Sequence, residues 1–118
     1  MSVSIKPNPR MPDSSVEIGN EASIVSGTIV ILAEHIVRSG KNYKLTGVYG
    51  TSNGDANFYL YQNSSTIDEF RTNAAERNYS KSFTSPLIFT SGTIVSLRIA
   101  HNEILSQIAT GMLMGFEE

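Results

Sequence analysis

The fold class is indicated by the stretch Ser26-Gly27-Thr28-Ile29-Val30-Ile31-Leu32, which Ser91-Gly92-Thr93-Ile94-Val95-Ser96-Leu97 nearly repeats. Each copy is a glycine turn followed directly by a run of β-branched apolar residues, a pattern typical of a half-buried strand that starts after a tight corner. The residues that flank the two copies do not match, so the repeat indicates one kind of strand entry used twice. The chain is therefore predicted to be all-β.

Further strands follow from short apolar runs, separated by clusters of Gly, Asn and Ser, that continue from Ser23 to the C-terminus. The spacing of these runs is typical of antiparallel sandwiches. Strands are expected at residues 23–26, 28–37, 42–50, 57–62, 67–72, 80–84, 93–100 and 107–116.

Alternation of apolar and polar residues predicts which side chains point inward, because a sheet with one wet face has a period of two. The inward sets expected are Tyr43, Leu45 and Tyr49; Phe58 and Leu60; and Val95, Leu97 and Ile99. Residues 29–32 are different, because they are apolar on both faces. Such a strand is covered twice, or has one face buried against another subunit. A β-bulge between Leu32 and Ile36 would explain a slip in the alternation there.

Two connections carry specific signals. Asn53-Gly54 is expected to supply the positive φ angles of a tight hairpin between its flanking strands. Thr66 and Glu69 form a capping-box pattern that would begin a helix over residues 66–77. Because residues 67–72 also alternate as a strand does, we expect a strand there, followed by a loop at 73–79.

Residues 1–22 differ in composition from the rest, with prolines at positions 7, 9 and 12 that remove backbone donors and favour extended geometry. This segment cannot bury enough apolar surface to fold alone, so it is either disordered or laid across a neighbour, including a neighbouring subunit. The expected organisation is an extended N-terminal arm at 1–22 and one β-sandwich domain at 23–118.

Charge and composition exclude several function classes. Nine basic and eleven acidic side chains give a formal net charge of −2 without a block of like charge, which disfavours a nucleic-acid partner. Cysteine is absent, so stability must come from packing or from partner subunits. The N-terminus lacks the pattern of a secretory signal, and no apolar run approaches the ~20 residues that span a bilayer. We expect a soluble protein without a membrane partner.

No group of residues has the pattern of a catalytic, metal or cofactor site. His35 and His101 are far apart in the sequence, and neither has further ligands at metal-site spacing. Asp55, Asp68 and Glu69 do not follow the calcium-loop pattern. We therefore expect no enzyme, with no catalytic residues, no metal and no cofactor. An enzyme would need one of the histidines beside a carboxylate in a cleft.

One group of residues suits a sugar ligand. Tyr59, Tyr61 and Arg71 could form a stacking patch, since aromatic faces and guanidinium groups suit polar planar ligands. Half-buried sheet cover is the other interpretation of the two tyrosines. A carbohydrate-binding β-sandwich module is thus the alternative function.

The order of four segments resembles small jelly-roll proteins of tailed bacteriophage virions, and the resemblance covers most of the chain from Ser23 to Phe116. The segments are residues 43–50 (YKLTGVYG), 53–61 (NGDANFYLY), 86–99 (PLIFTSGTIVSLRI) and 109–116 (ATGMLMGF). The resemblance implies an eight-stranded antiparallel jelly-roll-like sandwich that serves as a capsid decoration or cement protein, or as a neck, collar or tail-associated subunit. Such proteins usually form trimers or larger rings, so the implied partners are further copies and other virion proteins. The implied location is the virion, assembled in the host cytoplasm, and no catalytic residue carries over.

Apolar positions outside the core would then serve as subunit contacts. The candidates are Val3, Ile5, Val16, Ile18, Ile29, Ile31, Met112 and Met114. The two methionines could equally fill the core, since the flexible thioether side chain suits both roles.

Overall fold

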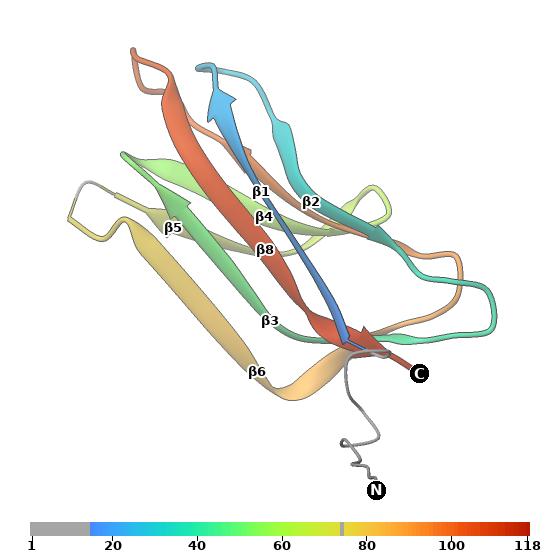
Figure 1. Cartoon of the computed structure of the whole chain (residues 1–118). Helices are drawn as coiled ribbons and strands as arrows, with labels where there is room; N and C mark the ends of the chain where they lie inside the picture. The colour runs from blue at the N-terminus through green and yellow to red at the C-terminus, as the bar shows by residue number, and fades with distance from the viewer. Residues whose placement is uncertain (1–14, 74) are drawn as a thin grey trace, which may run out of the picture.

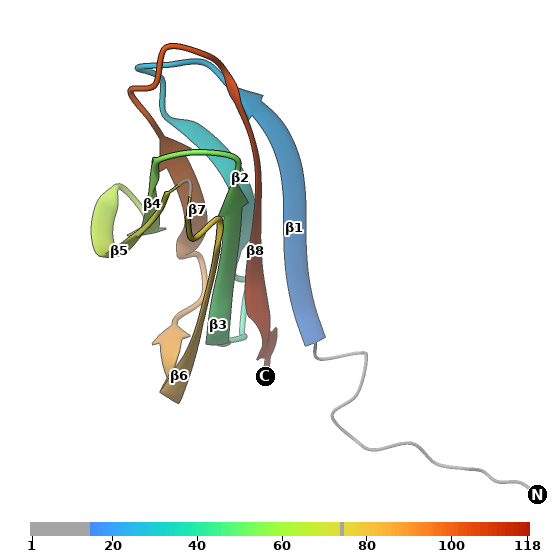
Figure 2. The ribbon, with the colours of Figure 1, turned by 90° about the vertical axis from the view of Figure 1, so that its left-hand side faces the viewer.

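The computed structural model describes residues 15–73 and 75–118 and contains two four-stranded antiparallel sheets packed face to face (Figures 1 and 2). Sheet A has the strand order β1-β8-β3-β6, and sheet B has the order β2-β7-β4-β5. The strands are β1 (Ser15–Ile24), β2 (Val30–Ile36), β3 (Tyr43–Ser52), β4 (Ala56–Gln62), β5 (Ser65–Thr72), β6 (Asn78–Phe89), β7 (Ile94–Ala100) and β8 (Gln107–Glu117).

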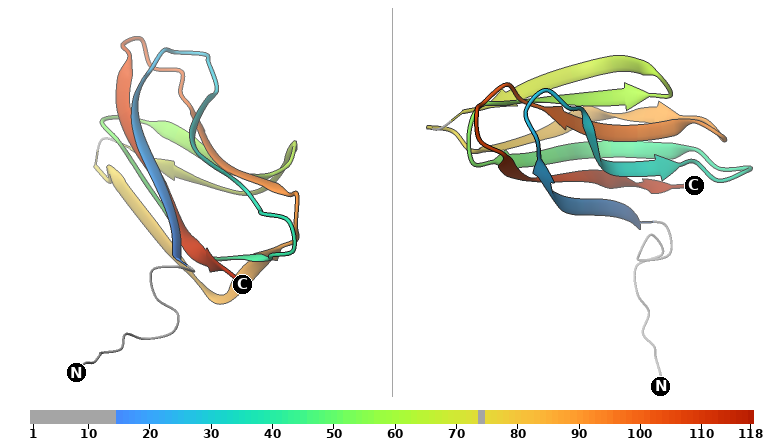
Figure 3. Two further views of the ribbon diagram at one scale, coloured as in Figure 1. Left: turned by 45° about the vertical axis from the view of Figure 1, so that its right-hand side comes forward. Right: turned by 90° about the horizontal axis from the view of Figure 1, so that it is seen from above.

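The chain crosses between the sheets in the order of a jelly roll. Strands far apart in the sequence become neighbours, since β1 pairs with β8 and β2 pairs with β7 (Figure 3). Strands β4 and β5 are consecutive and pair within sheet B. The two sheets are stacked on each other, so that the apolar residues on their facing sides are buried together. The expected all-β antiparallel sandwich of eight strands is confirmed.

The core lies between the sheets and is filled by alternate residues of the central strands. Phe58 and Leu60 of β4 are buried, and so are Val95, Leu97 and Ile99 of β7. These five positions are the ones that the period of two predicts.

The second residue of each copy of the repeated stretch is a glycine in the left-handed region, with φ of 81° at Gly27 and 84° at Gly92. Residues with a Cβ rarely adopt this backbone. The Gly27 amide donates to the His101 carbonyl and the Gly92 amide to the Val37 carbonyl, both at 2.9 Å. The two copies therefore make equivalent corners, one before β2 and one before β7.

A β-bulge in β3 overturns one inward prediction. The register shifts between Leu45 and Gly47 against both neighbouring strands. As a result Val48 is buried, whereas Tyr49 is half-buried on the outer face of sheet A. The prediction for Tyr49 is wrong because one unpaired residue reverses the alternation of every residue that follows it.

The slip expected in the first copy of the repeat is also a β-bulge. The register of β2 shifts between Ile31 and Ala33, so that Leu32 is the extra residue. Leu32 and Ala33 are both buried, at 2% and 3% exposure, as two consecutive residues at a bulge can be.

Some strand boundaries differ from those expected. β1 begins at Ser15 rather than at residue 23, so residues 15–22 of the expected arm are a strand of sheet A, paired with β8 throughout. Residues 1–14 lie outside the described residues. β5 is a strand, as expected, and not a helix over residues 66–77. β6 continues to Phe89, well beyond residue 84.

The connection at Asn53-Gly54 is not the expected hairpin, because β3 belongs to sheet A and β4 to sheet B. Neither residue has a positive φ. The chain turns a corner between the sheets instead. The Ser52 hydroxyl and the Asp55 carbonyl hold this corner through hydrogen bonds with the Gln107 side chain, at the start of β8. An Asn-Gly pair marks a turn but does not state which sheet receives the next strand.

Candidate functional site

A stripe of large apolar side chains runs along the outer face of sheet A. Met112, Met114 and Phe116 of β8 are half-buried and alternate with core residues such as Leu113. Two glycines on the flanking strands make room for them. A Cβ added to Gly19 of β1 or Gly47 of β3 would lie 3.2 Å from a methionine Cε atom.

The methionine side chains therefore lie sideways across sheet A, on the face turned away from the core. This placement excludes the core-filling interpretation of Met112 and Met114, because Leu113 occupies the core side of the strand. We call these three residues of β8 the methionine stripe.

The candidates on β1 face the other way. Val16 and Ile18 pack against the core of their own chain, and the Tyr43 hydroxyl donates to the Val16 carbonyl at 3.1 Å. They contribute to this subunit's own packing. Val3 and Ile5 lie outside the described residues.

Two candidates lie on or beside β2, an edge strand of sheet B. Ile29 is 58% exposed and Ile31 is 44% exposed. Because Leu32 is buried between the sheets, the apolar character of this stretch serves the core on one side and faces solvent on the other.

Tyr59, Tyr61 and Arg71 lie on the outer face of sheet B. The tyrosines alternate with the buried residues of β4, and Arg71 of β5 pairs with Asn57, two residues before Tyr59. The guanidinium carbon of Arg98 lies 4.1 Å from the centroid of the Tyr61 ring, so one face of that ring is already covered. This contact favours the interpretation of Tyr61 as sheet cover.

Two hollows lie at the end of the sandwich where β1 runs into β2 and β7 into β8. One, of about 150 Å³, is lined by Arg71, Asp55 and Glu103 among others. The second, of about 200 Å³, lies beside Leu105. Both are smaller than the roughly 300–1,000 Å³ of pockets that enclose a drug-sized ligand.

The same end of the sandwich carries a group of exposed aliphatic side chains, of which only Ile29 was expected from the sequence to be a contact. They are Val25 (59% exposed), Ile29 (58%), Ile104 (97%), Leu105 (77%) and Ile108 (57%). We call this group the apolar end. The signal in the sequence is the apolar pair Ile104-Leu105 inside an otherwise polar loop.

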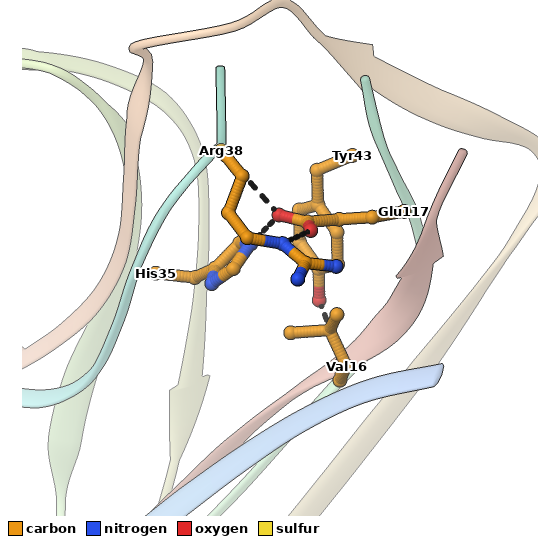
Figure 4. A network of polar contacts seen from close by, with 5 residues as sticks. All are labelled: Val16, His35, Arg38, Tyr43 and Glu117. Atoms are coloured by element: carbon orange, nitrogen blue, oxygen red, sulfur yellow. Dashed lines mark hydrogen bonds and ion pairs between the residues drawn. The ribbon is translucent and has the colours of Figure 1, made fainter. Parts of the chain in front are cut away.

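A buried carboxylate joins the two sheets at the opposite end (Figure 4). The Glu117 side chain, at the end of β8, is fully buried and forms an ion pair with His35 of β2. Arg38 also binds it, through Nε at 2.5 Å and through its backbone amide at 3.3 Å. Tyr43 packs against His35, with ring centroids 4.7 Å apart.

This network shifts two pKa values. Burial raises the pKa of Glu117, but the hydrogen bonds from Arg38 and His35 outweigh it and hold that pKa below its ordinary value. Burial raises the pKa of the Tyr43 hydroxyl well above its ordinary value, and the carboxylates of Glu117 and Glu17 add to the effect. Glu117 is therefore a carboxylate held between the sheets by the Arg38 guanidinium and by a hydrogen bond with His35.

The contact of His35 with a carboxylate is one part of what an enzyme would need, and sequence reasoning missed it. Nucleophilic catalysis also needs a nucleophile hydrogen-bonded to the histidine. Within residues 15–73 and 75–118, no hydroxyl group hydrogen-bonds to His35. His101 is 2% exposed, donates from Nε2 to the Ile24 carbonyl and accepts at Nδ1 from the Glu103 amide. Both histidines therefore have structural partners.

No three His, Cys, Asp or Glu side chains among the described residues come together as a metal site would require. Those residues also form no helix with the length and hydropathy needed to cross a membrane.

Comparison with known proteins gives a likeness of fold. No protein-family model and no curated protein matches the chain. Among solved structures, a chain of the acid-stable capsid of Helicobacter pylori bacteriophage KHP30 is similar with a TM-score of 0.51 and 11% identity, over 89% of this chain and 93% of that one. A chain of infectious bursal disease virus, Gt strain, overlaps with a TM-score of 0.35 and 10% identity, over 98% of this chain and 37% of that one. The chain thus has a jelly-roll fold that it shares, over nearly its whole length, with a chain of a phage capsid structure.

Proposed function

We propose that this chain is a non-enzymatic structural subunit of a bacteriophage particle. Its place would be that of a capsid decoration or cement protein, or of a neck, collar or tail-associated subunit. The observation that carries the proposal is the jelly-roll fold, similar over 89% of the chain to a chain of a phage capsid structure.

The surface of the sandwich supports a role that depends on contacts between subunits. The methionine stripe lies across the outer face of sheet A, and the apolar end lies at the tips of two loops. Monomeric soluble proteins rarely expose large contiguous apolar surfaces, and such surfaces usually mark contacts with other proteins. The flexible methionine side chains suit a contact that must adapt to its partner.

The partners in this proposal are further copies of the chain, as a trimer or larger ring, and other virion proteins. A net charge of −2 gives no electrostatic reason to add nucleic acid to them. The location would be the virion, after assembly in the host cytoplasm.

Sedimentation velocity of the purified full chain across a range of concentrations tests the proposal. We expect a trimer or larger closed oligomer, with mass that is independent of concentration above the dissociation range. A chain that stays monomeric at the highest concentrations and is also absent from particles would contradict the proposal.

A carbohydrate-binding module remains the second candidate, because Tyr59, Tyr61 and Arg71 share the outer face of sheet B. It predicts binding on a glycan array that is lost in Tyr59→Ala. Because Arg98 covers one face of Tyr61, any sugar would stack mainly on Tyr59. The structural proposal predicts an array without specific binding.

A further inference from the structure

The apolar end is built by two loops that lie side by side, β1–β2 at residues 25–29 and β7–β8 at residues 101–106 (Figures 1 and 3), together with Ile108 at the start of β8. The Gly27 amide donates to the His101 carbonyl at 2.9 Å, and the His101 ring donates to the Ile24 carbonyl at 2.7 Å. Because these bonds hold the loops together, their apolar side chains form a preformed surface that a partner can use without ordering it first.

We propose that the apolar end of one copy receives residues 1–14 of a neighbouring copy. This inference rests on the proposed function, since it states which surface joins the subunits. The segment suits this surface by the position at which it joins the sandwich, by its length and by its composition.

The end of β1 at which residues 1–14 join the sandwich favours a second copy as the one that receives them. β1 runs from Ser15 to Ile24, and Ile24 adjoins the apolar end, so residues 1–14 join the sandwich at the opposite end of β1. The ten residues of β1 span about 33 Å. To reach the apolar end of its own copy, the segment would have to reverse at Ser15 and run back along the whole strand. The apolar end of a second copy placed head to tail requires no reversal.

The length of the segment 1–14 allows it to reach a second copy. Fourteen residues in extended geometry reach about 46 Å at most, which exceeds the length of β1. The segment is thus long enough to leave its own sandwich and lie across the end of the next one.

The composition of residues 1–14 complements that of the apolar end. The segment contains apolar residues at its start, Met1, Val3 and Ile5, and the basic residues Lys6 and Arg10, with Asp13 as its one acid. Its three prolines remove backbone donors, so it suits contacts through side chains better than pairing at a sheet edge.

The receiving surface has the opposite charge. Exposed carboxylates stand around the apolar end on Glu21, Asp55 and Glu103, with Arg71 as a counter-charge in the hollow beside the last two. Like charges would oppose the packing of two apolar ends against each other, whereas the basic segment would complement them. The hollow beside Leu105 offers room next to the exposed aliphatic groups.

A contact of this kind joins two different surfaces, so it is heterologous. Repetition of a heterologous contact closes a ring when the rotation allows it. This is the form of assembly that the proposed function requires.

Zero-length carbodiimide cross-linking of the full chain tests the proposal. An equal mixture of ¹⁴N-labelled and ¹⁵N-labelled protein is cross-linked, and the peptides are identified by mass spectrometry. We expect Lys6 joined to Glu103, Asp55 or Glu21 in peptides of mixed label, which only a contact between two copies can produce.

The matched variants are all in the full chain. The double substitution Ile104→Ser with Leu105→Ser should reduce the mixed-label product about tenfold or more, since these two side chains form the most exposed part of the surface. Ile36→Ser is the control, because Ile36 is 57% exposed on the edge strand of sheet B and lies outside the apolar end. The control should retain the product.

Four results would overturn the inference. They are cross-links of single label only, cross-links of Lys6 to Glu17 or Glu69 instead, a product that persists in the double variant, and flotation with lipid vesicles that depends on Ile104 and Leu105. If the full chain still forms oligomers in any of these cases, the inference fails and the proposed function stands. If the unsubstituted full chain forms no oligomers and is not incorporated into particles, the proposed function itself is overturned.

Discussion

Replacement of Glu117 by glutamine tests how the two sheets are joined. Glutamine has nearly the same shape but no charge and only one acceptor oxygen, so the contacts with His35 and Arg38 lose their charge assistance and one of them faces an NH2 group that cannot accept. Hydrogen bonds to charged groups contribute about 1.5–3 kcal/mol each, and neutral ones about 0.5–1.5. Two such changes predict a loss of about 2 to 3 kcal/mol in the free energy of unfolding. The loss is no larger because the Arg38 side chain is 63% exposed and regains water when released.

The effect depends on pH in a stated direction. The pKa of Glu117 is lower in the folded protein than its ordinary value near 4.5. The unfolded chain therefore binds more protons in acid, and the stabilisation is complete above the ordinary pKa and is lost as the pH falls through the folded one. Glu117→Gln cannot titrate at this position. The free energies of unfolding of wild type and variant should differ most at neutral pH and converge as the pH falls below 4.5.

Urea unfolding followed by circular dichroism, at pH 7 and at steps below pH 5, measures both effects. The matched control is Glu118→Gln, since Glu118 is the neighbouring acid but is 52% exposed and pairs with Lys44 at the surface. The control should lose less than about 1 kcal/mol. Equal stability of Glu117→Gln and wild type at pH 7, or parallel curves through the acid range, would refute this account of the network.

Further predictions concern the core, an edge and the outer face of sheet B. Leu113→Ala should lower the free energy of unfolding by about 2–5 kcal/mol, and Met112→Ala by clearly less, since only Leu113 faces the core; equal losses in urea titrations would contradict the assignment of faces. Lys81→Met should cost less than about 1 kcal/mol, because its pair with Asp68 between the edge strands β6 and β5 is partly exposed; a larger loss in the same assay would show that this pair closes the sandwich. Tyr61→Ala should leave glycan-array signals unchanged, and the loss of a specific signal would favour the carbohydrate module.

The sequence predicted the parts of the fold that local patterns determine. The glycine corners at Gly27 and Gly92 and the alternation in β4 and β7 follow from backbone geometry and from the period of a strand. The bulge in β3 could not be predicted in the same way, because an extra residue is placed by the pairing of strands far apart in sequence. Tyr49 was assigned to the wrong face for that reason.

The candidate sites likewise divide into those that a local sequence pattern indicates and those that depend on contacts between residues far apart in the sequence. Glu117 gave no local signal, because its partners His35 and Arg38 are 82 and 79 positions away in the sequence. The apolar pair Ile104-Leu105 was visible, but an apolar loop residue becomes informative only when the structure shows it exposed beside another apolar loop. For Val16 and Ile18, the arm assignment hid a strand whose apolar residues serve the core.

The face on which each methionine lies also depended on the structure. Met112 and Met114 alternate in a way that fits either face of β8. Gly19 and Gly47 on the neighbouring strands leave the room that these side chains occupy on the outer face of sheet A. A sequence pattern indicates that the two faces of a strand differ. The packing of the neighbouring strands determines which of the two faces is covered.

Quantitative mass spectrometry of purified particles tests the central proposal most directly. Phage particles are isolated on a density gradient from lysates of cells that also produce this chain, and the copies of the chain per particle are counted against the major capsid protein. The account predicts that the chain co-sediments with particles in a fixed ratio of several copies each. A chain that stays in the soluble fraction, with no copies in the particle band, would contradict it.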